Sequence, residues 1–213
     1  MWENLSLQWQ AALEMAWEAY CAGTIPIGAV VADANGNIVS RGRNRIMDIS
    51  APDGQVYNDM LAHAEINALL ALNLDQENRH DSALYTTMEP CPLCMGAFYM
   101  SSVRTLHFAA RDPWAGSTNL LGTTPYLSRK SIKVFEPFDA VLEDILVALF
   151  TEYELHNRGE EFLSHRFFDI TRAVLPNAVE KGIVLHRSGG LRKKQKAGLP
   201  ANQVFDWLAH QVQ

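Results

Sequence analysis

Long hydrophobic runs and an abundance of cysteine are both missing from this 213-residue sequence. The longest apolar runs, such as residues 145–150, fall far short of the ~18 residues that a membrane-spanning helix needs. The start, Met-Trp-Glu-Asn, lacks the basic residues and the small-residue cleavage site of a secretory signal. Three cysteines, an odd number, do not make a disulfide framework, and they favour metal binding or catalysis in a reducing compartment. We therefore expect a cytoplasmic protein without a membrane span.

An excess of positive charge is missing as well. The chain carries 18 Lys and Arg against 24 Asp and Glu, so its net charge is −6. Six of the basic residues lie within residues 181–200, which contain no acidic residue, and the rest of the chain has a balance of −12. This acidity argues against a dedicated nucleic-acid-binding protein, but the basic segment leaves room for a local contact with RNA.

Helical and strand-like patterns alternate over the first 158 residues, which predicts an α/β sandwich around a mixed sheet. Apolar periodicity and turn signals place the helices at residues 5–22, 62–74, 92–101 and 140–156. Short β-branched segments place the strands at residues 26–32, 38–42, 83–87, 103–109 and 132–135. A long loop is expected over residues 46–62, directly before a helix, where such a loop often shapes or covers a site.

The last quarter of the chain is predicted to be a separate addition. We divide the chain into a domain of residues 1–158 and a C-terminal extension of residues 159–213, in which only residues 202–212 have a clear helical pattern. Several apolar residues predict that this extension is packed and mostly helical and is not a loose tail: Phe162, Phe167, Phe168, Val174 and Leu175.

The strongest motif combines one histidine with two cysteines. His63-Ala-Glu65 is followed after 24 residues by Pro90-Cys91-Pro-Leu-Cys94. One imidazole and two thiolates are the ligand number of a catalytic zinc site that keeps its fourth position for water. A helix that begins near Pro92 directs its positive end at the thiolates and favours metal binding. We therefore predict that His63, Cys91 and Cys94 bind Zn²⁺.

Glu65 is the candidate proton shuttle, because a carboxylate beside a zinc-activated water takes its proton and delivers it to a leaving group. The motif also fits two alternative kinds of site. Cys-x-x-Cys alone also occurs in redox sites, and a structural zinc needs a fourth protein ligand. Cys21 is expected in the core, so that ligand would have to come from another histidine: His80, His107, His156, His165, His186 or His210.

These motifs resemble the zinc-dependent cytidine deaminase superfamily, in the branch of tRNA adenosine deaminases and bacterial guanine deaminases. The resemblance covers about residues 5–157 and extends to Pro26-Ile-Gly-Ala, Asn44-Arg45, and Ala110-Arg-Asp with Ala115-Gly-Ser. It implies a three-layer fold with a mixed five-stranded sheet, usually dimeric, and hydrolytic deamination of a nucleobase. It also implies that Glu65 is catalytic and that Asn44 and the backbone of Ala64 contact the base.

Three functions remain open at this point. The favoured substrate is a small free purine or pyrimidine base or nucleoside, guanine-like, because Cys-Pro-Leu-Cys-Met-Gly is similar to the guanine deaminase helix. The alternative is a tRNA wobble adenosine, supported by the Ala110-Arg-Asp segment and by a basic run, Arg192 to Lys196, that is otherwise a solvated tail. Trp114 and Tyr126 are candidate base-stacking residues. A third hypothesis is a non-catalytic binding module that zinc only stabilises.

Overall fold

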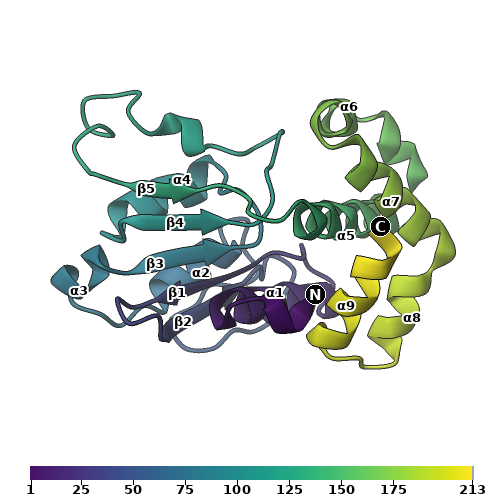
Figure 1. Ribbon diagram of the computed structural model, residues 1–213, viewed down its shortest axis with the longest axis horizontal. Coiled ribbons are helices and arrows are strands. Elements are labelled where there is room, and N and C mark those ends of the chain that lie inside the picture. Colours follow the sequence, from purple (N-terminus) through teal and green to yellow (C-terminus); the bar gives the residue numbers. More distant parts are fainter. Residues whose placement is uncertain (213) are drawn as a thin grey trace.

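The computed structural model describes residues 1–212, and a five-stranded mixed sheet lies at its centre (Figure 1). The order is β2-β1-β3-β4-β5; β1 pairs antiparallel with β2 and β3, whereas β3, β4 and β5 are parallel. This confirms the predicted sheet, whose strands run over Gly28–Ala32 (β1), Ile38–Arg43 (β2), Ala83–Thr86 (β3), Thr105–Phe108 (β4) and Lys133–Phe135 (β5).

Helices cover both faces of the sheet. On one face α1 (Leu7–Cys21) and α5 (Ala140–Arg158) share a core with Val30 of β1. On the other face α2 (Ala64–Leu70) and α4 (Pro92–Met100) share a second core with Ala29 and Val31. Because alternate residues of a strand point to opposite faces, β1 is buried along its whole length. The chain thus has the three-layer α/β architecture expected from its sequence.

The segment after residue 158 is helical and packs against the same core. It contains the short η3 (Glu160–Ser164), then α6 (Arg166–Val174), α7 (Pro176–Ser188), α8 (Gly190–Lys196) and α9 (Ala201–Val212). Trp17 Nε1 of α1 donates a 2.8 Å hydrogen bond to the Leu199 carbonyl, and Phe205 of α9 packs near the Trp2 ring. α9 therefore lies against α1 and α5 (Figure 1), and its apolar residues belong to the core that includes α1. The division of the chain at residue 158 stays a prediction.

Several local expectations were wrong. The helix expected over residues 62–74 ends at Leu70, and Gln76–His80 form a further short helix, α3. Most of residues 166–196 is helical although no clear period was found there, because α7 packs against α5 and α6 packs against α7. Cys21 is exposed at the last turn of α1 and is not a core residue, and Val174 is also exposed. Within residues 1–212, no helix combines the length and the apolarity that crossing a bilayer requires.

Candidate metal and substrate site

The three expected metal ligands meet at the ends of two helices. His63 precedes the first residue of α2 in extended conformation, and Cys91 holds the same position before α4. His63 Nδ1 lies 3.5 Å from Cys91 Sγ and 3.4 Å from Cys94 Sγ. Among the residues that the structure describes, His63, Cys91 and Cys94 form the group whose ligand atoms are placed to hold a metal, and no other histidine belongs to this group. A fourth protein ligand for a structural zinc is therefore absent from the described chain.

The distances fit zinc. Bonds of about 2.3 Å to sulfur and about 2.0–2.1 Å to nitrogen, at the tetrahedral angle, place a sulfur and a nitrogen donor about 3.5 Å apart. The distances from His63 Nδ1 to the two sulfur atoms match this separation. A set of two thiolates and one imidazole is one that Zn²⁺ prefers. The residues present therefore fit the metal that the sequence predicted.

Cys91 is prepared as a thiolate even without the ion. A hydrogen bond from the Cys94 thiol, helped by His63 and by the backbone at Cys94, lowers the pKa of Cys91 to about 4 despite partial burial. The position of Cys91 before the first turn of α4 adds the favourable end of the helix dipole. Because the thiolate is the metal-binding form, the local structure favours ligation through Cys91. The hydrogen bond to Cys91 and burial raise the pKa of the Cys94 thiol, so metal binding at Cys94 has to displace its proton.

Glu65 lies beside the ligands in the first turn of α2. It is 3% exposed; Oε2 accepts from Cys94 Sγ at 3.3 Å, and Oε1 accepts a 3.1 Å hydrogen bond from Thr86 Oγ1. Burial raises the pKa of the Glu65 carboxyl group above its usual value. His63 lies outside the helix, which allows residues only two apart in sequence to border one site.

Asn44 and Ala64, the expected base-contacting residues, both line the adjacent pocket. Asn44 Oδ1 accepts from Thr24 Oγ1 at 2.5 Å and from the Ile46 amide at 3.2 Å. These two donors fix the side-chain amide, and Nδ2 has no protein acceptor among residues 1–212. Ala64 begins α2, where backbone N–H groups lack partners within the helix. Both residues are thus placed to offer donors to a ligand.

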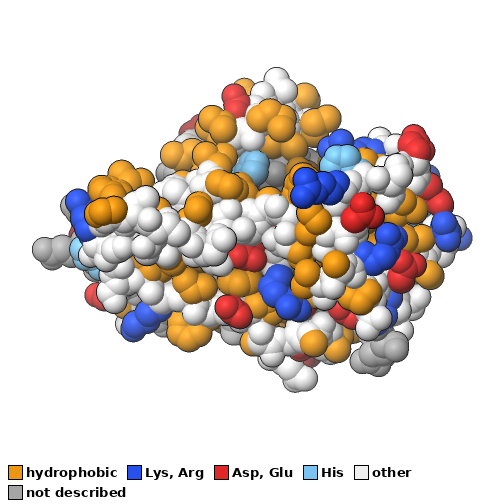
Figure 2. All heavy atoms as spheres, turned by 90° about the horizontal axis from the view of Figure 1, so that it is seen from above, with side chains coloured by type: hydrophobic (Ala, Val, Ile, Leu, Met, Phe, Trp, Pro, Cys, Tyr) orange, Lys and Arg blue, Asp and Glu red, His pale blue; other side chains and the backbone are white. Residues whose placement is uncertain are grey.

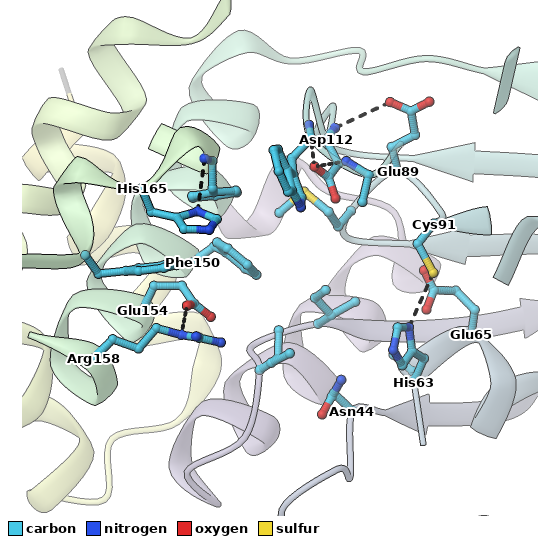
Figure 3. A pocket seen from close by; sticks show the side chains of 18 residues that line it. Asn44, His63, Glu65, Glu89, Cys91, Asp112, Phe150, Glu154, Arg158 and His165 are labelled. Carbon is cyan, nitrogen blue, oxygen red and sulfur yellow. Dashed lines mark hydrogen bonds and ion pairs between the residues drawn. The ribbon is translucent and has the colours of Figure 1, made fainter. Parts of the chain in front are cut away.

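The pocket is a cavity of about 300 Å³ between the metal ligands and the C-terminal part of the chain. Figure 3 shows His63, Glu65 and Cys91 on one side of the space, and Phe150, Glu154, Arg158 and His165 on the other. The far wall comes from α5, η3 and α6 of the same chain. It was not predicted, although Phe150, Glu154 and Arg158 recur every four residues on one face of α5, which is the signal that the sequence contained.

A loop fixed by Glu89 forms the third side of the pocket. Glu89 Oε1 accepts a 2.6 Å hydrogen bond from Thr118 Oγ1, and Oε2 accepts from the Asp112 amide at 3.4 Å. Gly116 lies so close to the Glu89 carboxylate that a Cβ there would fall 2.3 Å from Oε2. This positions Trp114, whose ring contacts His165 edge-on at a centroid distance of 5.8 Å. Glu89 therefore has a structural role, because it holds the loop that carries Trp114.

Two sequence-based expectations about this region do not hold. Tyr126 does not line the cavity; it packs beside Tyr99 and Arg129 in another part of the surface. The long loop before His63 also contributes no lining residue within the described chain. It is held away because Asp48 makes ion pairs of 2.6 Å and 2.7 Å with Arg43 and Arg45.

Comparison with known proteins agrees with this site. Residues 3–110 match the family model described as the cytidine and deoxycytidylate deaminase zinc-binding region. This match covers half of the chain and includes all three metal ligands. The chain belongs to this family.

Curated relatives of this family member have different substrates in their names. It is 40% identical over 108 residues to a tRNA-specific adenosine deaminase of Haemophilus influenzae, and 34% identical over 102 residues to a guanine deaminase of Bacillus subtilis. These alignments cover 50% and 46% of the chain. The chain spans about three fifths of each relative's own length, 58% and 60%.

Solved structures in the family show the same fold, and they also include both a tRNA deaminase and a guanine deaminase. A deaminase studied for A-to-I editing at the wobble position of transfer RNA superposes with a TM-score of 0.53 at 26% identity, over 65% of this chain and 97% of that one. A guanine deaminase from Nitrosomonas europaea superposes with a TM-score of 0.51 at 28% identity, over 68% and 82%. The substrate of this family member therefore has to be argued from its own pocket.

The basic run at the C-terminus is neither a tail nor freely exposed. It forms α8, and Arg192 makes a 3.2 Å ion pair with the buried Glu152 while its guanidinium lies over the Tyr20 ring. Lys194 lies over the ring of Trp207. On the face drawn in Figure 2, acidic and basic side chains are interspersed and no broad basic patch is seen. Lys193 and Lys196 are the lysines of α8 that are exposed.

Proposed function

We propose that this protein is a zinc-dependent hydrolytic deaminase that acts on a small nucleobase or nucleoside, with a guanine-like purine favoured. Water replaces the exocyclic amino group of the base, so that a C–N bond breaks, a C=O bond forms and ammonia leaves. The observation that carries the proposal is Glu65, buried beside the grouped His63, Cys91 and Cys94 at one end of the pocket.

The chain's own residues supply binding and proton transfer. Zinc, when bound by three protein ligands, supplies an activated water as nucleophile. Glu65 takes the proton of that water, gives it to the ring nitrogen, and assists the departure of the amine. Thr86 holds Oε1 of Glu65, so that Oε2 faces the metal ligands. Asn44 Nδ2 and the backbone of Ala64 hold the base in the orientation that this transfer needs.

The shape of the pocket favours a small substrate. A cavity of about 300 Å³ is at the small end of ligand pockets, which typically measure about 300–1,000 Å³. Residues of η3 and α6 stand across it from the metal ligands and limit the room beside the base. The absence of a disulfide framework and the need for reduced thiolates make a cytoplasmic location part of the same proposal.

Deamination of a wobble adenosine in tRNA is the second candidate function. The relative from Haemophilus influenzae and the wobble-editing structure favour it. Against it stand the internal contacts of Arg192 and Lys194, which occupy basic side chains that phosphate binding would use. A non-catalytic zinc module is the third, and it is opposed by the lack of a fourth protein ligand in the described chain.

We also propose a homodimer. Leu70 of α2, Leu93 and Met100 of α4 and Met60 just before α2 are exposed apolar side chains on the elements that carry the ligands. Burying such side chains against a second copy is favourable, at roughly 25 cal/mol per Å². Light scattering coupled to gel filtration measures the mass in solution; a monomer at micromolar concentration contradicts this part of the proposal.

An ammonia-release screen tests the activity. The zinc-loaded protein is offered free bases, nucleosides, nucleotides and a tRNA anticodon stem-loop. We expect ammonia from small substrates, and its loss in Glu65→Gln with one zinc per chain retained. Glu18→Gln, at an exposed position of α1, is the matched control. Full activity of Glu65→Gln contradicts the catalytic role, and activity on the stem-loop alone favours the tRNA enzyme.

A further inference from the structure

We propose that Glu154 and Arg158 form a ribose-binding subsite, which makes the substrate a ribonucleoside in preference to the free base. This inference rests on the proposed function, since it assigns the end of the pocket remote from the reacting carbon. Both residues line the cavity and belong to the last two turns of α5. In Figure 3 they stand across the cavity from His63 and Glu65.

Glu154 is a buried residue whose carboxylate borders the cavity. The residue is 6% exposed, and Arg158 Nε binds Oε2 at 2.6 Å. The residue lines the cavity, so its carboxylate faces a ligand bound there. Carboxylate oxygens accept hydrogen bonds, and a ligand hydroxyl in the pocket has a proton to donate.

Arg158 supplies the complementary donors. Its guanidinium lies 4.7 Å from the centroid of the Phe162 ring, and the side chain is 60% exposed, so it stands at the solvent side of Glu154. Nε is engaged with Glu154, and the two terminal nitrogens carry the further donors of the guanidinium. The pair therefore presents an acceptor and a donor next to each other.

A sugar hydroxyl fits this pair better than the other groups a substrate might present. A hydroxyl both donates and accepts, whereas a ring N–H of a free base only donates. A phosphate accepts only, and the cavity that would receive it is lined by four carboxylates against one guanidinium: Glu65, Glu89, Asp112, Glu154 and Arg158. Like charge makes a phosphate unfavourable there. The charges of the pocket thus favour a nucleoside over a nucleotide.

Aromatic side chains provide the remaining surface between the two ends. Phe150, Phe167 and Trp114 border the cavity, and the Phe150 and Phe167 rings lie 5.6 Å apart. Such rings pack against a base or the apolar face of a sugar. With the base held by Asn44 at the metal end, its sugar extends toward α5.

Steady-state kinetics with matched substrates test the subsite. The zinc-loaded full chain is assayed with guanine, guanosine, 2′-deoxyguanosine and guanosine monophosphate, and with the same adenine series. We expect kcat/KM for the ribonucleoside to exceed that for the free base and the monophosphate by at least about tenfold, as a charge-assisted hydrogen bond gives. In Glu154→Gln the ribonucleoside should lose about tenfold while the free base stays within about threefold. A wild type that prefers the free base, or a variant that loses both equally, overturns the inference.

A control variant, a second variant and a binding measurement complete the test of the subsite. Glu161→Gln, an exposed neighbour that does not line the cavity, is the matched control. Arg158→Gln is the second variant should Glu154→Gln not fold. Its side chain is mostly exposed, so the variant should fold, and it should reduce the preference for the ribonucleoside over the free base. Calorimetry of inosine against hypoxanthine measures the subsite without turnover. Tighter inosine binding that Glu154→Gln removes supports the subsite even if no ammonia is released; equal binding overturns it, whereas absent ammonia release alone counts against the proposed function.

Discussion

Thr86 Oγ1 donates a 3.1 Å hydrogen bond to Glu65 Oε1, and both side chains are buried. The contact joins the end of β3 to the first turn of α2, so the sheet positions the carboxylate that lies beside the metal ligands. Thr86 is not among the residues that line the cavity, so it acts through Glu65.

Thr86→Val should therefore lower kcat by about tenfold with zinc content unchanged, because it removes a hydrogen bond to a charged group and keeps the shape. Losing this donor also destabilises the charged carboxylate, so the acidic limb of the pH–rate profile should move to higher pH. Thr105→Val on β4 is the control. Unchanged kcat and an unchanged profile would show that Thr86 does not position Glu65.

Glu143 should make stability depend on pH. Burial raises the pKa of Glu143, but bidentate hydrogen bonds from Arg111, at 2.8 Å each, outweigh it and hold the pKa below the usual 4.5. A carboxylate whose pKa is lowered in the folded state stabilises the fold at pH values above its unfolded-state pKa. This contribution is lost as the pH falls through its folded-state pKa. Since the Arg111 side chain is 45% exposed, solvent screening reduces the effect.

We expect Glu143→Gln to lower the free energy of unfolding by about 1–2 kcal/mol at pH 7 and by much less below the lowered pKa. Urea unfolding at neutral and at strongly acidic pH measures both values. Glu3→Gln, at an exposed N-terminal position, is the control. An equal loss at both pH values would argue against the ion pair as the cause.

Asp48 should control the order of the loop before His63. It accepts from Arg43 and Arg45, whose side chains are each 12% exposed. Asp48→Asn leaves two largely buried guanidinium groups without their counter-charge, which should cost about 2–4 kcal/mol of unfolding free energy. Thermal unfolding and limited proteolysis of residues 46–62 measure the change, with exposed Asp53→Asn as the control. Unaltered cleavage would contradict an anchoring role.

Neutralising Lys193 and Lys196 together tests the RNA-binding alternative, because these α8 lysines are exposed. We expect Lys193→Ala/Lys196→Ala to leave small-substrate kcat/KM unchanged. Binding of the anticodon stem-loop should keep the same dependence on salt. Lys133→Ala on β5 is the control. A clear decrease in the salt slope for the double variant, with weaker stem-loop affinity, would instead favour a tRNA substrate.

Local sequence patterns were sufficient to predict the half of the pocket that holds Glu65 and the metal ligands. The spacing of His63, Cys91 and Cys94 predicts a metal site because each ligand lies at a helix end that the sequence signals, Pro92 being the clearest. The strands were also predicted from short local patterns, either alternating or fully apolar. α6 and α7 were missed because tertiary packing stabilises them, α7 against α5 and α6 against α7, and α8 is only seven residues long.

By itself the sequence determined the ligands, the adjacent Glu65 and the layered α/β class, because these depend on residue types and short spacings. Tertiary structure alone decided what faces the metal site. It brings Glu154 and Arg158 of α5 across from His63, and it uses Arg192 of the basic run to pair with Glu152 inside the fold. Such pairings join residues far apart in the chain, and only the packing of helices on the sheet sets them.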